Sequence, residues 1–311
     1  KKIVASGMIG NGLEWYDYAL YGQMAWLLAK LFFPAGDPTV ALLATFGVFA
    51  AGFIVRPIGG ILFGWIGDTY GRKTAMVLAV LMMAIPTGCI GLLPTYEAIG
   101  IWAPALLTII RLLQGLSLGG EFSGSITYIV EHAPPGKRGN AGSTSLISLN
   151  LGFLLGIAMT QGCMWLLGVE IFESWGWRIP FILGVGIGLI GFYIRTHCAE
   201  SPVYEAAKEN GHLSETPLKA AFKEHPWELL QRFAMYMTVT MPFYLTTVYF
   251  ISFSANHLGL SMQEAFTINT IIMIVLLFAM PLSAWLSDHI GRRKIMIVMA
   301  AVMLVSVAPL F

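Results

Sequence analysis

Charged residues are scarce in this sequence. Only 11% of its 311 residues are Asp, Glu, Lys or Arg, against about 25% in ordinary soluble domains. Hydrophobic residues make up 57% of the chain, which is more apolar surface than one soluble core can bury. A water-soluble globular protein is therefore excluded, and we expect a membrane protein.

Cysteines are few and catalytic motifs are missing. Cys89, Cys163 and Cys198 fit neither a disulfide framework nor a metal-ligand spacing. There is no G-x-x-x-x-G-K-S/T phosphate loop, no H-E-x-x-H and no Ser-His-Asp order, so neither an ATP-driven pump of that class nor an enzyme is expected. A net charge of +1 provides no basic field for nucleic acid. We expect no cofactor, no metal ion and no nucleic-acid partner.

Long uncharged stretches are present instead. Residues 74–96, 139–169, 233–256 and 265–287 contain no Asp, Glu, Lys or Arg, and about 20 helical residues cross about 30 Å of hydrocarbon. Because these runs are continuous, they favour helices over the short alternating strands of a membrane β-barrel. When segments with one to three charges are included, the sequence predicts an all-α membrane protein with nine helices, at about 3–31, 39–63, 74–93, 104–131, 139–168, 177–195, 228–256, 264–286 and 295–311.

The basic residues predict the orientation of these helices. If every helix crosses the membrane, most Lys and Arg residues fall in alternate loops, and the positive-inside rule makes that side cytoplasmic. The opposite loops carry mainly acids, namely Asp37, Glu97, Glu170 and Glu173. We therefore expect a multi-pass protein with a cytoplasmic amino terminus. The basic residues on the expected cytoplasmic side are Lys1, Lys2, Arg72, Lys73, Lys137, Arg138, Arg195, Lys208, Lys219, Lys223, Arg292, Arg293 and Lys294.

One loop pattern occurs twice. Residues 64–73 read G-W-I-G-D-T-Y-G-R-K and residues 284–294 read A-W-L-S-D-H-I-G-R-R-K, so Asp68 and Asp288 are 220 positions apart. A repeat at this spacing indicates duplication of a unit of about six helices. We predict a six-helix half over 1–195, a cytoplasmic linker over 196–226 and part of a second half over 227–311. Because a second half of six helices needs about three more than the sequence contains, about three further helices are expected, and the start at Lys1 and the end inside an apolar run also indicate a fragment.

The repeated loop resembles the signature of the major facilitator superfamily. More specific segments are similar to its metabolite:proton symporter branch, over nearly the whole chain. The resemblance implies twelve helices in two halves, a bacterial-type inner membrane, and solute import coupled to protons. Residues 89–104 resemble the proline and glycine-betaine symporters, while citrate, 2-oxoglutarate and shikimate carriers look similar. The segments are G-N-G-L-E-W-Y-D-Y-A-L-Y-G (10–22), R-P-I-G-G (56–60), R-L-L-Q-G-L-S-L-G-G-E (111–121), W-G-W-R-I-P (175–180) and E-S-P (200–202).

Charged residues within the expected helices are candidate site residues, because they are costly in hydrocarbon. At a rise of about 1.5 Å per residue, Asp17 lies roughly 20 Å from the cytoplasmic surface and Arg111 roughly 9 Å from the outer one. In a slab of about 30 Å the two are level. The sugar porters of the superfamily carry an acid and an arginine in similar motifs, which implies that Asp17 binds the proton and Arg111 is its partner. A static ion pair between the two helices is the alternative.

Three more charged residues lie within the expected helices, where burial in hydrocarbon is costly. Glu14 lies three residues before Asp17 on nearly the same helix face, so we group it with the coupling residues. Glu121 is either a solute-binding group or a hydrogen-bonded structural acid. Arg56 is expected to be structural, before a kink at Pro57. Three embedded acids against two arginines suit a zwitterionic solute better than a dicarboxylate.

Aromatic residues crowd the same turns and are candidate solute contacts. Aromatic faces can hold a quaternary ammonium group, although ordinary packing or a belt at the membrane interface is the better explanation for any single ring. The predicted solute-contacting rings are Trp15, Tyr18, Tyr21 and Phe122, beside Glu121.

The repeated loops are candidate gates. The resemblance to the superfamily implies that this loop holds the cytoplasmic side of the transporter closed. The alternative is that its basic residues only set the orientation of the helix in the membrane. The gating residues expected in the first copy are Gly64, Asp68, Gly71, Arg72 and Lys73, and those in the second copy are Asp288, Arg292 and Arg293. The hypothesis is a proton-coupled secondary transporter for a small polar metabolite that works by alternating access. A passive facilitator or a non-transporting membrane sensor is the alternative class.

Overall fold

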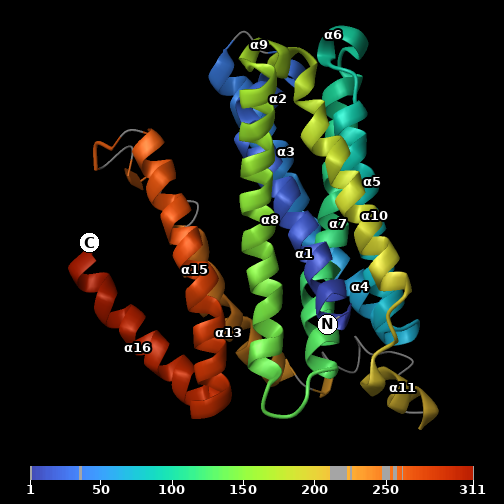
Figure 1. Ribbon diagram of the computed structural model, residues 1–311, viewed down its shortest axis with the longest axis vertical. Helices are drawn as coiled ribbons and strands as arrows, with labels where there is room; N and C mark the ends of the chain where they lie inside the picture. The colour runs from blue at the N-terminus through green and yellow to red at the C-terminus, as the bar shows by residue number, and fades with distance from the viewer. Residues whose placement is uncertain are drawn as a thin grey trace. The chain divides into compact units, whose positions relative to one another are not determined.

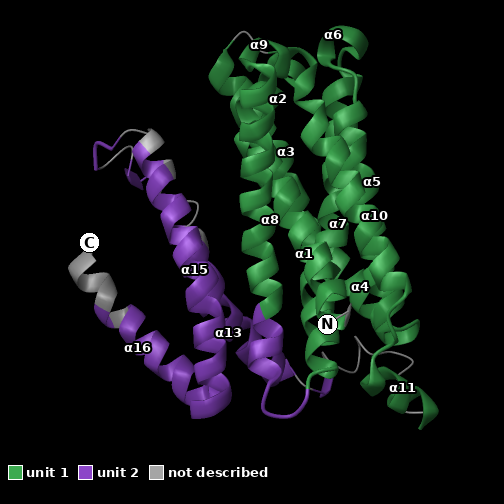
Figure 2. Cartoon of the chain, viewed as in Figure 1, with its two compact units in different colours: residues 1–133, 144–215 green, residues 134–143, 216–311 purple. Residues whose placement is uncertain are grey.

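The computed structural model describes residues 2–34, 37–210, 223–224, 226–246, 253–254, 258–260 and 262–310. Every regular element in these ranges is a helix, which confirms the all-α class. The chain divides into two compact units, residues 1–133 with 144–215 and residues 134–143 with 216–311 (Figure 2). Parts of the predicted linker and of the predicted helix at 228–256 lie outside the described residues. The predicted domain boundaries stay predictions.

The helices follow the predicted spans closely. Unit 1 contains α1 (Lys2–Gln23), α2 (Ala25–Phe32), α3 (Pro38–Ile54), α4 (Arg56–Thr69), α5 (Arg72–Leu92), α6 (Tyr96–Ile99), α7 (Trp102–Glu131), most of α8 (Arg138–Leu167), α9 (Val169–Ile171), the π-helix η1 (Phe172–Gly176), α10 (Arg178–Thr196) and α11 (Pro202–Glu209). Unit 2 contains the first turn of α8, α13 (Pro226–Tyr244), α15 (Met262–Ile290) and α16 (Arg292–Leu310).

Several helices are long and apolar enough to cross a membrane. Within the described residues, six spans meet this requirement of length and composition: Pro38–Thr69, Arg72–Leu92, Trp102–Glu131, Arg138–Leu167, Arg178–Thr196 and Thr267–Ile290. Many large apolar side chains on their outer faces are exposed, as in a protein that lipid surrounds.

Local sequence signals explain where these helices begin and break. Pro38 occupies the start of α3, where its missing N–H has no cost, and the Asp37 carboxylate accepts from the Thr39 amide at 2.8 Å. The expected helix at 39–63 breaks at Val55, and Pro57 stands in the first turn of α4. The kink predicted at Pro57 is therefore confirmed, whereas the break at Met24 between α1 and α2 was not predicted.

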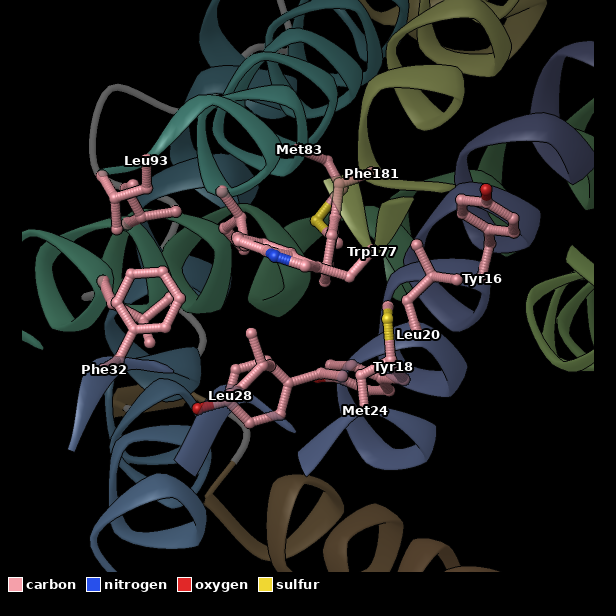
Figure 3. Close-up of a cluster of buried hydrophobic side chains, with 14 of the residues drawn as sticks. Tyr16, Tyr18, Leu20, Met24, Leu28, Phe32, Met83, Leu93, Trp177 and Phe181 are labelled. Atoms are coloured by element: carbon pink, nitrogen blue, oxygen red, sulfur yellow. The ribbon is translucent and has the colours of Figure 1, made fainter. Parts of the chain in front are cut away.

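Unit 1 is a helical bundle in which α5 packs along both α7 and α10, and α7 packs along α4. Figure 1 shows the amino end of α1 and α11 at one end of this bundle, and α6 and α9 at the other. Its largest core cluster joins α1 and α2 to α5 and α10 and includes Trp177, Phe32 and Phe181 (Figure 3). The Tyr16 hydroxyl donates to the Pro180 carbonyl at 2.6 Å. Together these contacts hold α1, the helix that carries Glu14 and Asp17, in place.

Glycines allow the closest helix contacts in unit 1. A Cβ atom at Gly119 of α7 would overlap the Arg56 carbonyl and the Gly60 amide of α4. A Cβ at Gly152 of α8 would overlap the Gly12 backbone of α1. The small residues thus let backbones touch, as is usual where no hydrophobic force drives helices together.

In unit 2, α15 and α16 pack against each other and are joined at Gly291, whose φ is +102°. The Asp288 carboxylate accepts from the amides of Gly139 and Asn140 at 2.9 and 2.8 Å. These amides belong to the first turn of α8, where backbone N–H groups have no partner within the helix. Asp288 therefore caps this turn.

Candidate functional site

A buried ion pair joins α1 to α7. Asp17 Oδ2 lies 2.5 Å from Arg111 Nη1, and the two side chains are 0% and 3% exposed. The structure thus brings together the two residues whose depths were predicted to match. Removing two charges from water is costly, so their geometry must provide compensating hydrogen bonds.

Two polar residues complete these hydrogen bonds. The Gln114 amide donates to Asp17 Oδ1 at 3.0 Å and its carbonyl accepts from Arg111 Nη1 at 2.9 Å. The Thr87 hydroxyl of α5 donates to Asp17 Oδ1 at 3.0 Å. Both Asp17 oxygens are therefore engaged, by residues from two other helices. Any change in the charge of Asp17 acts on three helices at once.

An aromatic ring lies against the same arginine. The Tyr21 ring centroid is 3.8 Å from the Arg111 guanidinium carbon, a distance at which a cation is attracted to a π face. The Tyr21 hydroxyl donates to the Thr45 carbonyl at 2.9 Å, and its ring stacks on Phe49. Tyr21, predicted as a solute contact, is thus in contact with the Asp17–Arg111 pair.

The pair formed by Glu14 and Arg56 is looser. Glu14 Oε1 lies 3.9 Å from Arg56 Nη2, and the side chains are 4% and 24% exposed. The Arg56 guanidinium lies over the Phe53 ring at 3.9 Å and over the Tyr18 ring at 5.1 Å. Tyr18 and the half-buried Trp15 form an edge-to-face pair. Two of the predicted solute-contacting rings therefore lie beside this pair.

Glu121 is engaged by an arginine that the sequence interpretation placed in a cytoplasmic loop. Arg195, near the end of α10, is 1% exposed and donates from Nη1 and Nη2 to the two Glu121 oxygens. It also donates to the carbonyls of Ser6 and Met76. The loop placement was wrong, because the long side chain turns into the bundle. This geometry favours the structural alternative for Glu121, and Phe122 on the next position is half-buried.

Arg195 also changes the balance of embedded charge. It adds a third arginine to the three buried acids, so the excess of acid that suggested a zwitterion does not exist. The Gly10 position provides room for this pair, since a Cβ there would overlap Glu121 Oε1 and Arg195 Nη2.

The first repeated loop lies at the end of α4. Asp68 and Arg72 form an ion pair of 2.6 Å, and Arg72 Nε is 4.0 Å from Glu131. Gly71 has φ +106°, a conformation that favours glycine. The Lys73 amide donates to both oxygens of Glu200, at 3.0 and 3.2 Å.

The remaining parts of this loop differ in their surroundings. In the part of the chain that the structure describes, no other residue lies within 4 Å of a Cβ built at Gly64. The Tyr204 hydroxyl of α11 donates to the Thr69 carbonyl at 2.9 Å. Burial, and then the nearby Glu200 carboxylate, raise the pKa of the Tyr204 phenol above its ordinary value. The E-S-P segment thus ties α11 to the loop.

The second loop repeats part of this geometry. Arg292 Nη2 lies 3.7 Å from Asp288 Oδ1, again four positions apart in sequence. Arg293 is exposed. The capping of α8 by Asp288 adds a partner that the sequence did not reveal.

Sequence reasoning missed Gln114, Thr87 and Arg195. Gln114 could have been found, because it lies three residues after Arg111 and so shares its helix face. Thr87 lies in an uncharged stretch without a distinguishing signal. Within the described residues, no three His, Cys, Asp or Glu side chains gather as a metal site would require.

Comparison with known proteins identifies the family. A model described as "Sugar (and other) transporter" matches residues 3–227 and 217–311. The chain belongs to the sugar (and other) transporter family. The proline/betaine transporter of Salmonella typhimurium is 36% identical to this chain, in a match that covers 100% of this chain and 64% of the relative. The alpha-ketoglutarate permease of Escherichia coli is 38% identical over 97% of the chain and 69% of its own length.

Solved structures show the same fold. The proton:xylose symporter XylE, a major facilitator superfamily protein, has a TM-score of 0.76 at 17% identity and covers 94% of this chain and 70% of its own. The predicted major facilitator fold is therefore confirmed, and the family is one of transporters rather than enzymes. The chain spans 64% of the length of the Salmonella relative.

Proposed function

We propose that this chain forms most of a secondary active transporter that imports a small polar metabolite together with protons. The observation that carries the proposal is the buried Asp17 carboxylate, held by Arg111, Gln114 and Thr87 from two other helices. A carboxylate is the group in this bundle that can gain and lose a proton, and its neighbours belong to elements that would move in transport.

The coupling follows from opposing electrostatic effects. Desolvation favours the neutral acid, whereas the Arg111 guanidinium favours the carboxylate. When water reaches Asp17 from one side and then the other, this balance shifts, so the group can take up a proton and release it. Protonation removes the attraction between α1 and α7, which links proton binding to helix position. A static pair would lack this alternation of water access.

The proposed solute is a proline- or betaine-type zwitterion. The Salmonella relative, 36% identical over the whole chain, is named a proline/betaine transporter, and aromatic rings on α1 suit an ammonium group. The relative named alpha-ketoglutarate permease is equally similar, so a dicarboxylate is the competing solute. We also propose that the protein lies in a bacterial-type inner membrane with a cytoplasmic amino terminus, as the basic loops predict.

The repeated loops are proposed gates on the cytoplasmic side. The Asp68–Arg72 pair and the contacts of Glu200 and Glu131 tie α4, α5, α7 and the α11 segment together. Ion pairs that are partly open to water, such as Asp68–Arg72, are weak enough to open and close. Transport would require such a release on each cycle.

Proton flux into proteoliposomes tests the function. We expect betaine or proline added outside, at zero initial pH difference, to make the external medium more alkaline, because the solute brings protons inward. The same experiment with 2-oxoglutarate compares the solute classes. Solute uptake without any external alkalinisation would mean a passive facilitator, and no uptake of any solute would favour a membrane sensor.

A further inference from the structure

The buried Glu14 and the half-buried Arg56 form a pair that leaves polar atoms unsatisfied. Glu14 Oε1 and Arg56 Nη2 are 3.9 Å apart, which is beyond the donor–acceptor distance of about 2.7 to 3.2 Å in an ordinary N–H···O hydrogen bond. Glu14 Oε2 and Arg56 Nε and Nη2 are buried and have no hydrogen-bond partner among the described residues. A buried charged group without partners is costly. Such a pair is therefore suited to a ligand that supplies what is missing.

The acids of the other two acid–arginine pairs of unit 1 have no such unsatisfied oxygen. Both oxygens of Asp17 accept hydrogen bonds, from Arg111, Gln114 and Thr87. Both oxygens of Glu121 accept from Arg195. Glu14 alone among these three acids has an oxygen without a donor. The contrast therefore lies in the acids, because Arg111 Nε and Nη2 are buried without a hydrogen-bond partner as well.

The surroundings of this pair favour a cation beside the acid. The Tyr18 ring lies next to the Arg56 guanidinium and stacks on Phe53. The Trp15 ring meets Tyr18 edge to face, with centroids 5.6 Å apart. Aromatic rings attract alkylated ammonium groups, for which hydrogen bonding is weak or absent, and these rings lie on or beside the α1 turns that carry Glu14.

We infer that Glu14 and Arg56 bind the two charged ends of a zwitterionic solute. The ammonium group lies against the Glu14 carboxylate and the Tyr18 and Trp15 rings, and the solute carboxylate accepts hydrogen bonds from Arg56. This inference rests on the proposed function, for which it names the solute site. It assigns Glu14 to the solute rather than to the proton, and it gives Arg56 a binding role in place of the structural one expected from the sequence.

The assignment also explains how solute and proton could be coupled. Glu14 and Asp17 are three residues apart on α1, so they lie about one turn apart on nearly the same face. A charge that arrives at Glu14 acts on the same turns that carry Asp17. The solute site and the proton site are thus adjacent but made of different residues.

Equilibrium binding to the complete transporter in detergent, without any proton gradient, tests the inference. Three ligands of similar shape separate the two charges. Glycine betaine carries both, 3,3-dimethylbutanoate carries only the carboxylate, and choline carries only the quaternary ammonium. The variants are Glu14→Gln and Arg56→Gln. Glu97→Gln and Arg138→Gln are matched controls, because both residues are exposed and outside the site.

Betaine binding should respond to both variants, and the binding of each singly charged ligand should respond to only one. Glu14→Gln should weaken the binding of betaine and of choline by about tenfold or more, which is the loss expected for a charge-assisted contact. The same variant should bind dimethylbutanoate as tightly as the wild type or more tightly. Arg56→Gln should weaken betaine and dimethylbutanoate by a similar factor and leave choline unchanged. The retained ligand in each case shows that the variant is folded. The two controls should bind all three ligands as the wild type does.

The outcomes distinguish this site from the proposed coupling. Unchanged betaine binding in Glu14→Gln would overturn the inference. An equal loss of affinity for all three ligands in both variants would overturn it too. Absence of betaine binding to the wild-type protein would overturn it as well. If the ligand pattern holds but solute addition moves no protons in proteoliposomes, the site stands and the coupling is wrong.

Discussion

At the scale of single residues, three acid–arginine pairs of the same chemistry differ in how completely their atoms are paired. Asp17 and Arg111 share Gln114 as a common hydrogen-bond partner. Glu121 and Arg195 form a bidentate contact, the strongest arrangement for these groups. Bidentate pairing suits a fixed link between helices, whereas a pair that shares neutral partners can lose its charge without losing all its hydrogen bonds.

Asp17→Asn separates proton coupling from solute movement. Asparagine has nearly the same shape, but its single amide oxygen can accept from Arg111 or from Thr87 and not from both, and it cannot bind a proton. We expect accumulation driven by a pH gradient to disappear, while exchange of labelled for unlabelled solute remains measurable. Radiolabelled uptake and counterflow in proteoliposomes measure the two. Accumulation at the wild-type level would reject Asp17 as the proton site.

Arg111→Ala should be more damaging than Asp17→Asn. It leaves the Asp17 carboxylate buried beside neutral donors only and removes the cation from the Tyr21 ring. Breaking a buried pair in this way costs about 3 to 5 kcal/mol. We expect both accumulation and exchange to fall below detection, with a lower unfolding temperature in detergent. A nearly normal exchange rate would show that the pairing is not needed for transport.

Arg195→Met tests whether Glu121 is a structural acid. The single change leaves Glu121 buried without its cation and should cost about 3 to 5 kcal/mol of stability. Adding Glu121→Gln to it removes the uncompensated charge and should recover much of that loss. Unfolding of the two variants in mixed micelles measures the difference. Equal destabilisation in the single and double variants would contradict a structural pair.

The Asp17–Arg111 contact could be predicted from the sequence, because the rise per residue of a helix converts sequence position into depth in the membrane. It could not predict the Arg195–Glu121 contact, since a long side chain near a helix end can turn inward as readily as toward water. Hydrogen-bond partners such as Thr87 depend on the rotation of α5 about its axis. Hydropathy does not determine this rotation in a helix that is apolar on all sides.

At the scale of the helices, close backbone contact explains the glycine spacing on α7. Cβ atoms at Gly115 and Gly119 would overlap the carbonyls of Gly52 and Arg56, on α3 and α4. Helix spans were predictable to within a few residues in the described parts, since hydropathy and length determine them. The interruption at Met24 was not predictable, because no proline or glycine stands at that position to mark it.

Gly119→Ala and Gly124→Ala form a matched pair on α7. The first substitution forces a methyl group into the α4 backbone and should cost about 1 to 3 kcal/mol. The second meets open space and should be neutral or slightly stabilising, because alanine is the better helix former by about 1 kcal/mol. Unfolding temperatures in detergent measure both. Equal temperatures for the two variants would mean that α4 and α7 are not in backbone contact.

At the scale of the whole chain, the repeat found in the sequence has a counterpart in local conformation. Gly71 and Gly291 have φ values of +106° and +102°, and each follows an aspartate that pairs with the arginine four positions later. The copies differ in their partners. Glu200 lies against Gly71, whereas a Cβ at Gly291 would meet no atom of the described residues within 4 Å. The sequence predicted that the loops correspond, but not that only the first is enclosed by a neighbouring segment.

This difference predicts unequal effects of the same substitution in the two copies. Alanine at either glycine must adopt a backbone conformation that non-glycine residues rarely occupy, at a cost of about 1 to 3 kcal/mol. Gly71→Ala should cost more than Gly291→Ala, because its methyl group would also displace the Glu200 carboxylate from the Lys73 amide. Neither glycine contacts the buried charge pairs, so equilibrium betaine binding should remain at the wild-type level while the transport rate falls further for Gly71→Ala. Unfolding temperature, binding and initial uptake rate, measured on both variants, separate the two effects. Equal losses of stability in the two copies would show that Glu200 does not hold the first loop, and lost binding would place these loops within the solute site rather than at a gate.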